Sequence, residues 1–285
     1  ENNKIIPLDD LNIPGWEIIF KENIPVMKFL GKGPAINLYA SKGCPYTCFY
    51  YCVYPMQQGR KLRLKNPKKV VEEMIYFHHK LNVNNYIFRD PVFSIDKKHT
   101  ILLCQEILKS GIKFNIAVET HLKNIDNELA DLFLKCGVKL IYVGIESADE
   151  EVKKDAKRWS DENDAQLKKI NYLERIGIKI KTMYIIGFPE ENEQKFLKTV
   201  DYALKVNSSY AQFSVFTPYP GTPVYKEYEK KIIAKRFEDF NQWKLVFKHK
   251  NFDEKSVRRL LDFAFKKYYL RFSWVKKLLI NKIFS

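Results

Sequence analysis

The stretch that decides the fold is Gly43-Cys44-Pro45-Tyr46-Thr47-Cys48-Phe49-Tyr50-Tyr51-Cys52, directly after an apolar run at residues 36–40. It places three cysteines within nine residues. Thiolates are soft ligands and bind iron–sulfur clusters or zinc most often. A straight helix would separate Cys44 from Cys52 by about 12 Å along its axis, too far for one compact centre. We therefore expect this loop to curl around a metal.

The loop alone does not identify the metal. Three thiolates would serve three irons of a cubane cluster and leave the fourth iron free, which is the mark of a catalytic centre. The spacing Cys-x3-Cys-x3-Cys also falls within the loose range of zinc sites, with a histidine as fourth ligand. A trio of buried structural thiols fits less well, because the intervening Tyr and Thr suit an exposed loop. The pattern favours a cluster over zinc.

Length and composition bound the class of protein. The chain has 285 residues, of which 46% are hydrophobic, enough for one large domain or a domain with an appendage. No run of 18 apolar residues predicts a membrane-spanning helix. The chain starts with Glu1 rather than Met and its first ten residues are polar and acidic, so we expect a fragment or a processed chain without a signal peptide.

Cysteine usage points to a reducing compartment. Of the five cysteines, three belong to the loop, which does not suit a disulfide framework and predicts a cytoplasmic protein. Cys104 and Cys136 lie in apolar helical patterns and are expected to be core thiols.

From residue 36 onward, apolar β-branched runs alternate with amphipathic helical stretches. Residues 1–35 are rich in Pro and Gly and are expected to form an extended lead-in linker with little helix. Strands are expected at 36–40, 86–89, 114–119, 140–146, 178–188 and 210–216, and helices at 67–81, 97–110, 126–136, 161–176 and 191–206. This alternation predicts an α/β protein with a parallel sheet, either an open doubly wound sheet or a partial barrel.

Polar residues follow nearly every expected strand, where parallel α/β proteins build their sites. The first strand runs into the cysteine loop, and the next three end at Asp90, Glu119 and Glu146. The last two run into Gly/Pro turns at 187–191 and 218–222. Any one of these carboxylates taken alone would most simply be a helix cap or an exposed loop charge. Their coincidence at strand ends favours the barrel and a site at its mouth.

At this point the sequence resembles the radical S-adenosylmethionine (SAM) superfamily, and more narrowly the catalytic part of its cobalamin-binding-type members, over roughly residues 5 to 230. The motifs that carry the resemblance are Pro7-Leu8-Asp9-Asp10 with Gly15-Trp16, Lys42-Gly43-Cys44-Pro45-Tyr46-Thr47-Cys48, Gly144-Ile145-Glu146-Ser147, Ile186-Gly187-Phe188-Pro189-Glu190-Glu191, and Phe216-Thr217-Pro218-Tyr219-Pro220-Gly221-Thr222.

The resemblance implies a partial (β/α)6 TIM-like barrel at residues 36–230 that holds a [4Fe-4S] cluster and SAM. Cys44, Cys48 and Cys52 would be the cluster ligands. The open iron would bind SAM, whose reductive cleavage gives a 5′-deoxyadenosyl radical that takes hydrogen from a substrate. The residues that match SAM-contacting positions of the family are Tyr51, near adenine, Asp90, near the methionine amino group, and Glu119, Glu146 and Ser147, near the ribose or amino-acid part.

Three departures from the family pattern bear on the site. The usual spacing is Cys-x3-Cys-x2-Cys, so one extra residue before Cys52 must be absorbed by a bulge. Pro91 stands where relatives often have a second acid, and His121 where many have Arg. Relatives also carry an upstream cobalamin domain that is not in this chain, so cobalamin is expected only if such a domain exists.

Net charge is +15, and the end of the chain concentrates it: residues 248–282 hold eleven Lys or Arg against three acids. Residues 231–285 are expected to form a basic amphipathic helical extension, with apolar positions at helical spacing at Val257, Leu261, Ala264, Tyr268, Phe272, Val275 and Leu279. The simpler interpretation is a helix that caps the barrel. The alternative is a helix on an anionic membrane, which would give the protein a peripheral place on the inner face of the membrane.

The sequence thus predicts a radical SAM enzyme acting on a hydrophobic, lipid-like or natural-product substrate by hydrogen abstraction, with methylation as a further outcome. It would need a reductant such as flavodoxin or ferredoxin. The competing hypothesis is a degenerate or zinc-stabilised barrel that acts as a binding protein. No nucleic-acid module is recognisable, so nucleic acid is only the runner-up partner.

Overall fold

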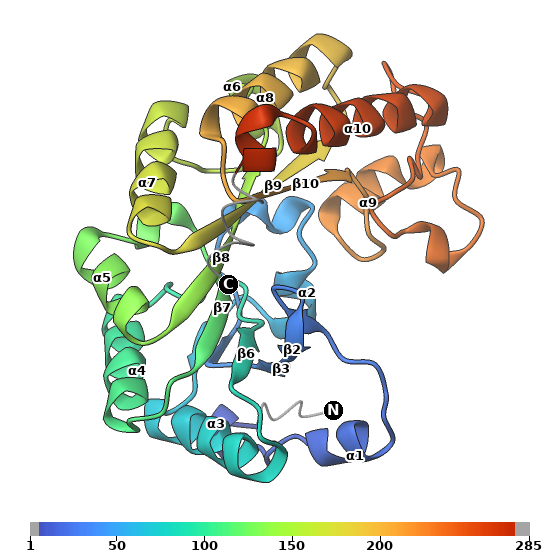
Figure 1. Ribbon diagram of the computed structural model, residues 1–285. Coiled ribbons are helices and arrows are strands. Elements are labelled where there is room, and N and C mark those ends of the chain that lie inside the picture. Colours follow the sequence, from blue (N-terminus) through green and yellow to red (C-terminus); the bar gives the residue numbers. More distant parts are fainter. Residues whose placement is uncertain (1–5, 277–285) are drawn as a thin grey trace. The chain divides into compact units, whose positions relative to one another are not determined.

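The computed structural model describes residues 6–276 (Figure 1). By contacts the chain divides into two compact units. The first comprises residues up to 45, 58–142 and 176–178, and the second comprises 46–57, 143–175 and 179 onward.

The main sheet has six strands in the order β10-β9-β8-β7-β6-β3. Their bounds are β3 Ile36–Leu38, β6 Asn85–Phe88, β7 Asn115–Glu119, β8 Val138–Glu146, β9 Lys179–Ile186 and β10 Tyr210–Val215. The pairs β3–β6, β6–β7 and β7–β8 of the first unit and β9–β10 of the second are parallel. Each strand neighbours the next one along the chain, with no reversal of order, which rules out a doubly wound sheet because such a sheet needs a switch point. The fold class is the expected one, α/β with the strand order of a partial (β/α)6 TIM-like barrel.

The helices between these strands also match the expected ones to within two residues. They are α3 Pro67–Leu81, α4 Lys97–Lys109, α5 Asn127–Lys135, α7 Asn163–Arg175 and α8 Glu193–Val206. Their starts follow from local chemistry: the side chain of Asn66 accepts a hydrogen bond from the Lys68 N–H, and Pro67 occupies the first helical position. Asp161 is not the helix start we expected, since α7 begins at Asn163.

The lead-in is more ordered than expected. Instead of an extended linker it contains the helix α1 Trp16–Lys21 and a hairpin of β1 Lys28–Phe29 with β2 Lys32–Pro34. α1 is six residues long, too short for hydrophobic periodicity to reveal it. The remaining short elements are α2 Tyr54–Gln58, β4 Ser41–Lys42, β5 Arg63–Leu64, α6 Glu150–Asp155 and α9 Pro223–Tyr228.

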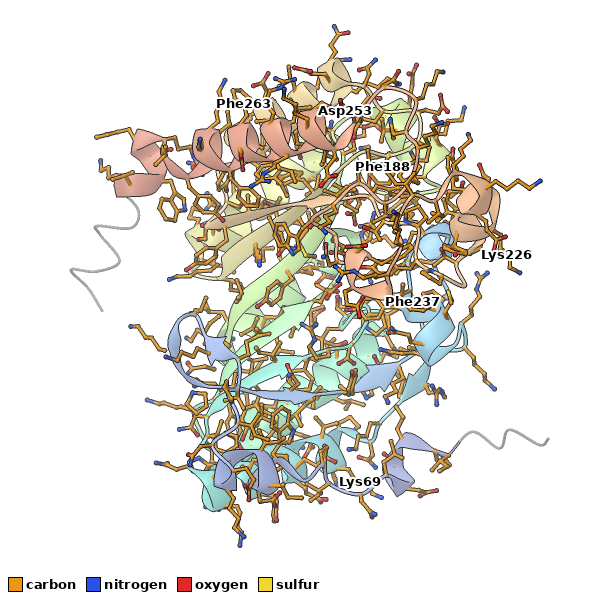
Figure 2. The ribbon with its side chains drawn as sticks, turned by 90° about the vertical axis from the view of Figure 1, so that its right-hand side faces the viewer. Lys69, Phe188, Lys226, Phe237, Asp253 and Phe263 are labelled. Atoms are coloured by element: carbon orange, nitrogen blue, oxygen red, sulfur yellow. The ribbon has the colours of Figure 1, made fainter. Side chains whose placement is uncertain are left out.

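The basic extension forms α10 Glu254–Tyr269 and uses its apolar face inside the protein. Val257, Leu261, Ala264 and Tyr268 are all buried, and α10 packs on β10 and α8. In Figure 2, Asp253 lies at the start of this helix, and Phe263 lies along it, on the exposed side. The helix is interrupted at residues 270–271, helical backbone resumes at residues 272–276, and Leu279 lies outside the described residues. The capping interpretation is confirmed for α10.

Within residues 6–276, no helix is both long and apolar enough to cross a membrane. The two expected core thiols are confirmed: Cys104 and Cys136 are buried in the first unit with their sulfur atoms 3.4 Å apart.

Candidate active site

The cysteine loop passes from one unit to the other between Pro45 and Tyr46. Cys44 therefore belongs to the first unit, where it is buried and its N–H donates to the Gly59 carbonyl oxygen over 3.1 Å. Gly43 has φ +93°, and a Cβ there would lie 2.1 Å from the Lys61 carbonyl oxygen. Only glycine fits that backbone path, so the sequence requires glycine directly before the first loop cysteine.

Cys48 and Cys52 belong to the second unit and lie on one tight turn. A 3-10 helix at Thr47–Tyr50 begins this turn, and the N–H of Cys52 donates to the Cys48 carbonyl oxygen over 3.0 Å. Residues four apart on a helical turn share one side of it. The extra residue before Cys52 is thus absorbed by a full turn, and the loop curls as expected.

The Cys48 thiol is unusually acidic. Its pKa is lowered to about 7, chiefly by a hydrogen bond with the Cys52 side chain and also by the positive charge of Arg158, against the opposing effects of burial and of Glu146. A thiol with this pKa is about half thiolate at neutral pH, and thiolate is the form that binds metal.

Glu146 is the best-marked carboxylate at a strand end. It closes β8 with φ +66°, a left-handed conformation that is uncommon for a residue other than glycine and that clusters at functional sites. Its Oε1 lies 3.8 Å from Nη2 of Arg158, and both side chains are largely buried. Burial raises the pKa of Glu146, and Arg158 opposes that rise. A Cβ on Gly144 would lie 2.4 Å from Glu146 Oε1, so this glycine makes room for the pair.

Arg158 is the functional candidate that sequence reasoning missed. It follows α6, and its Nη2 donates to the Gly144 carbonyl oxygen over 2.7 Å. Burial alone would lower the pKa of its guanidinium, but Glu146, Tyr51 and Cys48 outweigh burial and keep it charged. Its Nε–H is buried and has no hydrogen-bond partner among the described residues. The available signal was the basic pair Lys157-Arg158, which follows the Glu146 motif along the chain.

Tyr51 lines the same turn with an aromatic wall. Its ring lies 5.7 Å from that of Phe188 and 5.9 Å from that of Phe216, measured between centroids. Burial and Glu146 raise the pKa of its hydroxyl well above the usual value. The hydroxyl therefore stays protonated at neutral pH.

Asp90 is held inside the first unit. It is fully buried; one carboxylate oxygen accepts from the Ala40 N–H at 3.1 Å and the other from the Ser41 hydroxyl at 2.6 Å. Burial raises its pKa to about 7, although these hydrogen bonds oppose the rise. Asp90 thus fixes the backbone between β3 and the cysteine loop.

The other predicted site residues are placed as follows. Glu119 ends β7 in the first unit and is half-buried. Ser147 is buried in the second unit, where its hydroxyl lies 3.2 Å from the Thr199 hydroxyl and accepts from the Asp149 N–H. These contacts join the start of α6 to the middle of α8, so Ser147 has a supporting role.

The Gly/Pro turn after β9 contains another buried acid. Glu191 accepts from the Gly187 N–H over 2.6 Å, and its second oxygen, Oε1, has no partner among the described residues. Burial raises its pKa to about 8. The Glu191 carboxylate therefore hydrogen-bonds to the backbone of its own turn.

In the part of the chain that the structure describes, no three His, Cys, Asp or Glu side chains converge as ligands of one metal ion. A zinc site would need such convergence. A cubane cluster would not, because each thiolate binds a different iron.

A scan against protein-family models matches the radical SAM superfamily over residues 38–203, more than half of the chain. The chain belongs to the radical SAM superfamily. The match starts at the last residue of β3 and extends into α8, so among the site residues described above it leaves out only Phe216.

Relatives of this radical SAM protein include methyltransferases and cyclases. An uncharacterized methyltransferase of Pyrococcus horikoshii is 26% identical over 98% of this chain and 59% of its own length. An anaerobic magnesium-protoporphyrin IX monomethyl ester cyclase of Rubrivivax gelatinosus is 27% identical over 82% of this chain and 42% of its own length. The chain thus spans about two fifths to three fifths of the curated relatives it matches.

Among solved structures, the radical SAM methyltransferase TsrM of Kitasatospora setae, with cobalamin and a [4Fe-4S] cluster bound, has a TM-score of 0.63. It is 20% identical over 70% of this chain and 40% of its own length, a likeness that concerns the fold. Membership of the superfamily implies a [4Fe-4S] cluster and SAM. The donor set fits: one loop carries three cysteine thiols, and one of them, Cys48, is acidified beside the charged guanidinium of Arg158.

Proposed function

We propose that this radical SAM protein cleaves SAM reductively and abstracts hydrogen from a hydrophobic, lipid-like or natural-product substrate. The observation that carries the proposal is the arrangement at the end of β8. There an acidified thiol, Cys48, lies in the electrostatic reach of Arg158, whose buried Nε–H has no partner among the described residues. A binding protein of the zinc or degenerate type is not favoured by the family match or by these groups.

In this proposal Cys44, Cys48 and Cys52 hold the cluster. With SAM bound, a [4Fe-4S] cluster supplies the electron that breaks SAM into methionine and a 5′-deoxyadenosyl radical. The loop residues hold the three sulfur atoms, and the low pKa of Cys48 lets this thiol give up its proton near neutral pH.

The second unit offers groups for the charged end of SAM. A guanidinium recognises a carboxylate by charge-assisted hydrogen bonds, so Arg158 is assigned to the methionine carboxylate. Glu146 is assigned to a hydrogen-bond donor of SAM, its amino group or ribose, and Tyr51 to the adenine. Glu119 is assigned to the ribose. Asp90 and Ser147, whose polar atoms are already engaged, are assigned to holding the backbone around the site.

Methylation or cyclisation is the outcome that the relatives' names suggest for the reaction after hydrogen abstraction. Cobalamin enters this proposal only through a part of a longer protein beyond these residues. The electron would come from a reductant such as flavodoxin or ferredoxin.

The decisive experiment is anaerobic reconstitution of the full chain with iron and sulfide, followed by reduction in the presence of SAM. We expect a brown protein that forms 5′-deoxyadenosine. Cys48→Ala and Cys52→Ala should lose both the cluster and 5′-deoxyadenosine formation. Cys104→Ala is the matched control, because it removes a thiol outside the loop and should keep both.

Two results would contradict the proposal. Bound zinc in place of iron and sulfide would exclude the cluster, and a stable cluster without 5′-deoxyadenosine would leave a degenerate scaffold. A full cluster in Cys52→Ala would show that this third ligand is misassigned.

We also propose a peripheral membrane contact through the segment after α10. The apolar face of α10 is used inside the protein, but Leu270 and Phe272 beyond it are 75% and 83% exposed, next to Lys267 and Arg271. Cosedimentation with anionic phosphatidylglycerol vesicles at low salt should fall on raising the salt and in Phe272→Asp. Equal recovery in the pellet with and without vesicles would end this idea.

A further inference from the structure

The first unit contains a cavity of about 490 Å³ that none of the loop cysteines lines. It lies between the lead-in and β3, the edge strand of the sheet. Most of its wall is apolar and comes from the side chains of Leu8, Leu11, Trp16, Ile19 and Leu38. A volume of this size is in the range of small-molecule sites.

Hydrogen bonds hold the part of the cavity wall that the lead-in forms. The Asp9 carboxylate accepts from the Asn66 N–H at 2.7 Å, and the Lys69 ammonium donates to the Asp9 carbonyl oxygen at 2.7 Å. Tyr76 of α3 is hydrogen-bonded to Glu17 of α1, and the two helices lie side by side (Figure 1). The cavity is therefore a preformed feature of this unit.

The cavity has few polar groups, and one of them lacks a hydrogen-bond partner among the described residues. Lys65 and Glu73 form an ion pair whose side chains are only 9% and 7% exposed. The buried side-chain oxygen of Asn37 has no hydrogen-bond partner among the described residues. A buried acceptor without a partner disfavours folding, so its presence at an apolar cavity points to a ligand that donates a hydrogen bond to it.

Charge and position indicate what this ligand is. Lys42 also lines the cavity, which gives two ammonium groups against one carboxylate. Lys42 directly precedes Gly43 and Cys44, so the cavity borders the strand end that leads into the cysteine loop. An apolar wall with a cationic border and a single free acceptor suits an amphipathic anion with one hydrogen-bond donor.

We propose that this cavity is a binding site for an amphipathic anion. Its apolar body contacts Trp16 and its neighbours, its carboxylate or phosphate pairs with Lys42 and Lys65, and a donor group reaches Asn37 Oδ1.

The test measures binding of dodecanoate, dodecyl phosphate and dodecanol to the full chain by isothermal titration calorimetry, below micelle concentrations. Both anions should bind at least about tenfold more tightly than the neutral alcohol of equal tail length, and the better anion identifies the head group. Leu11→Asp and Lys42→Met should each weaken the anions about tenfold or more.

Matched controls are Ile233→Asp and Lys226→Glu, which alter an exposed isoleucine and an exposed lysine of the second unit. Binding that survives both cavity variants, or that is lost in Ile233→Asp, would overturn the inference. So would equal affinity for dodecanol, or no binding of any probe. Circular dichroism of Leu11→Asp checks its folding, and Lys42→Met tests the site without placing a charge in the apolar wall.

Binding and catalysis fail separately in this design. The calorimetry needs neither cluster nor SAM, whereas 5′-deoxyadenosine formation is measured without substrate. A protein that cleaves SAM but binds no anion refutes only the cavity, and one that binds anions but cleaves no SAM refutes only the enzyme.

Discussion

Asp90 and Glu146 are both carboxyl groups at strand ends, Asp90 after β6 and Glu146 at the end of β8. They differ in their hydrogen-bond partners and in their backbone conformation. Burial raises the pKa of both. Both oxygens of Asp90 accept hydrogen bonds from the backbone and side chain just before the cysteine loop. Glu146 instead sits at φ +66° opposite Arg158, whose Nε–H has no partner in the described chain.

This difference distinguishes a carboxyl group that supports the backbone around the site from one that contacts a ligand. A buried carboxyl whose acceptors are all used has nothing left for a ligand, and it orders what lies around it. A carboxyl held in a strained conformation beside an unsatisfied cation is stable only if something else completes the arrangement. The following predictions test whether these two residues really belong to different classes.

The largest expected effect is on the pH dependence of stability through Asp90. Its folded-state pKa is about 7 against an ordinary value of 3.8. A raised pKa means that the folded state binds the extra proton, so this stabilisation is complete below pH 3.8 and is lost as pH rises through about 7. Between pH 5 and pH 8 the wild type should lose about 3 kcal/mol of unfolding free energy that Asp90→Asn does not lose.

Urea unfolding of the two proteins across this pH range measures the difference, which does not depend on the absolute stability of the variant. Asp201→Asn, at an exposed position of α8, is the control, and its unfolding free energy should change with pH as that of the wild type does. If the unfolding free energy of Asp90→Asn also changed with pH as that of the wild type does, Asp90 would not be buried in its protonated form.

The sequence could predict where these carboxyls are but not which class each belongs to. Strand periodicity located β6 and β8 to within two residues, and the predicted parallel sheet gave the expectation that both strand ends share one edge. Backbone φ at Glu146 and the hydrogen bonds of Asp90 depend on tertiary contacts that no local pattern encodes. Arg158 lies in a loop between α6 and α7, where no periodicity marks it. The motifs fixed the cysteine loop because its chemistry is local.

The next effect is on SAM binding. Arg158→Met should weaken binding of SAM to the reconstituted protein about 100-fold, because the carboxylate would lose a largely buried charged partner. Arg158→Lys should recover part of that loss, since the charge returns without the planar guanidinium. Asp90→Asn should change the affinity less than about threefold, because its carboxylate already has its partners.

Equilibrium dialysis with labelled SAM gives these affinities, with iron content measured in each sample so that cluster loss is not mistaken for lost contact. Arg175→Met removes an exposed arginine of the same unit and should bind SAM as wild type does. If Asp90→Asn lost as much affinity as Arg158→Met, the distinction between the two carboxyl groups would collapse.

The smallest expected effect isolates the backbone strain at Glu146. Both Glu146→Ala and Glu146→Gly remove the carboxylate and leave Arg158 equally unpaired, so their difference reports only the left-handed conformation at this position. The Cβ of alanine is sterically unfavourable at φ +66°, whereas glycine has no Cβ. Glu146→Gly should therefore be the more stable of the two by about 1 kcal/mol in urea unfolding. At Asp90, which is not among the residues with positive φ, the order should reverse, because glycine loses more chain entropy on folding than alanine. The same order at both positions would show that Glu146 is not strained, and the contrast between the two strand ends would then rest on Arg158 alone.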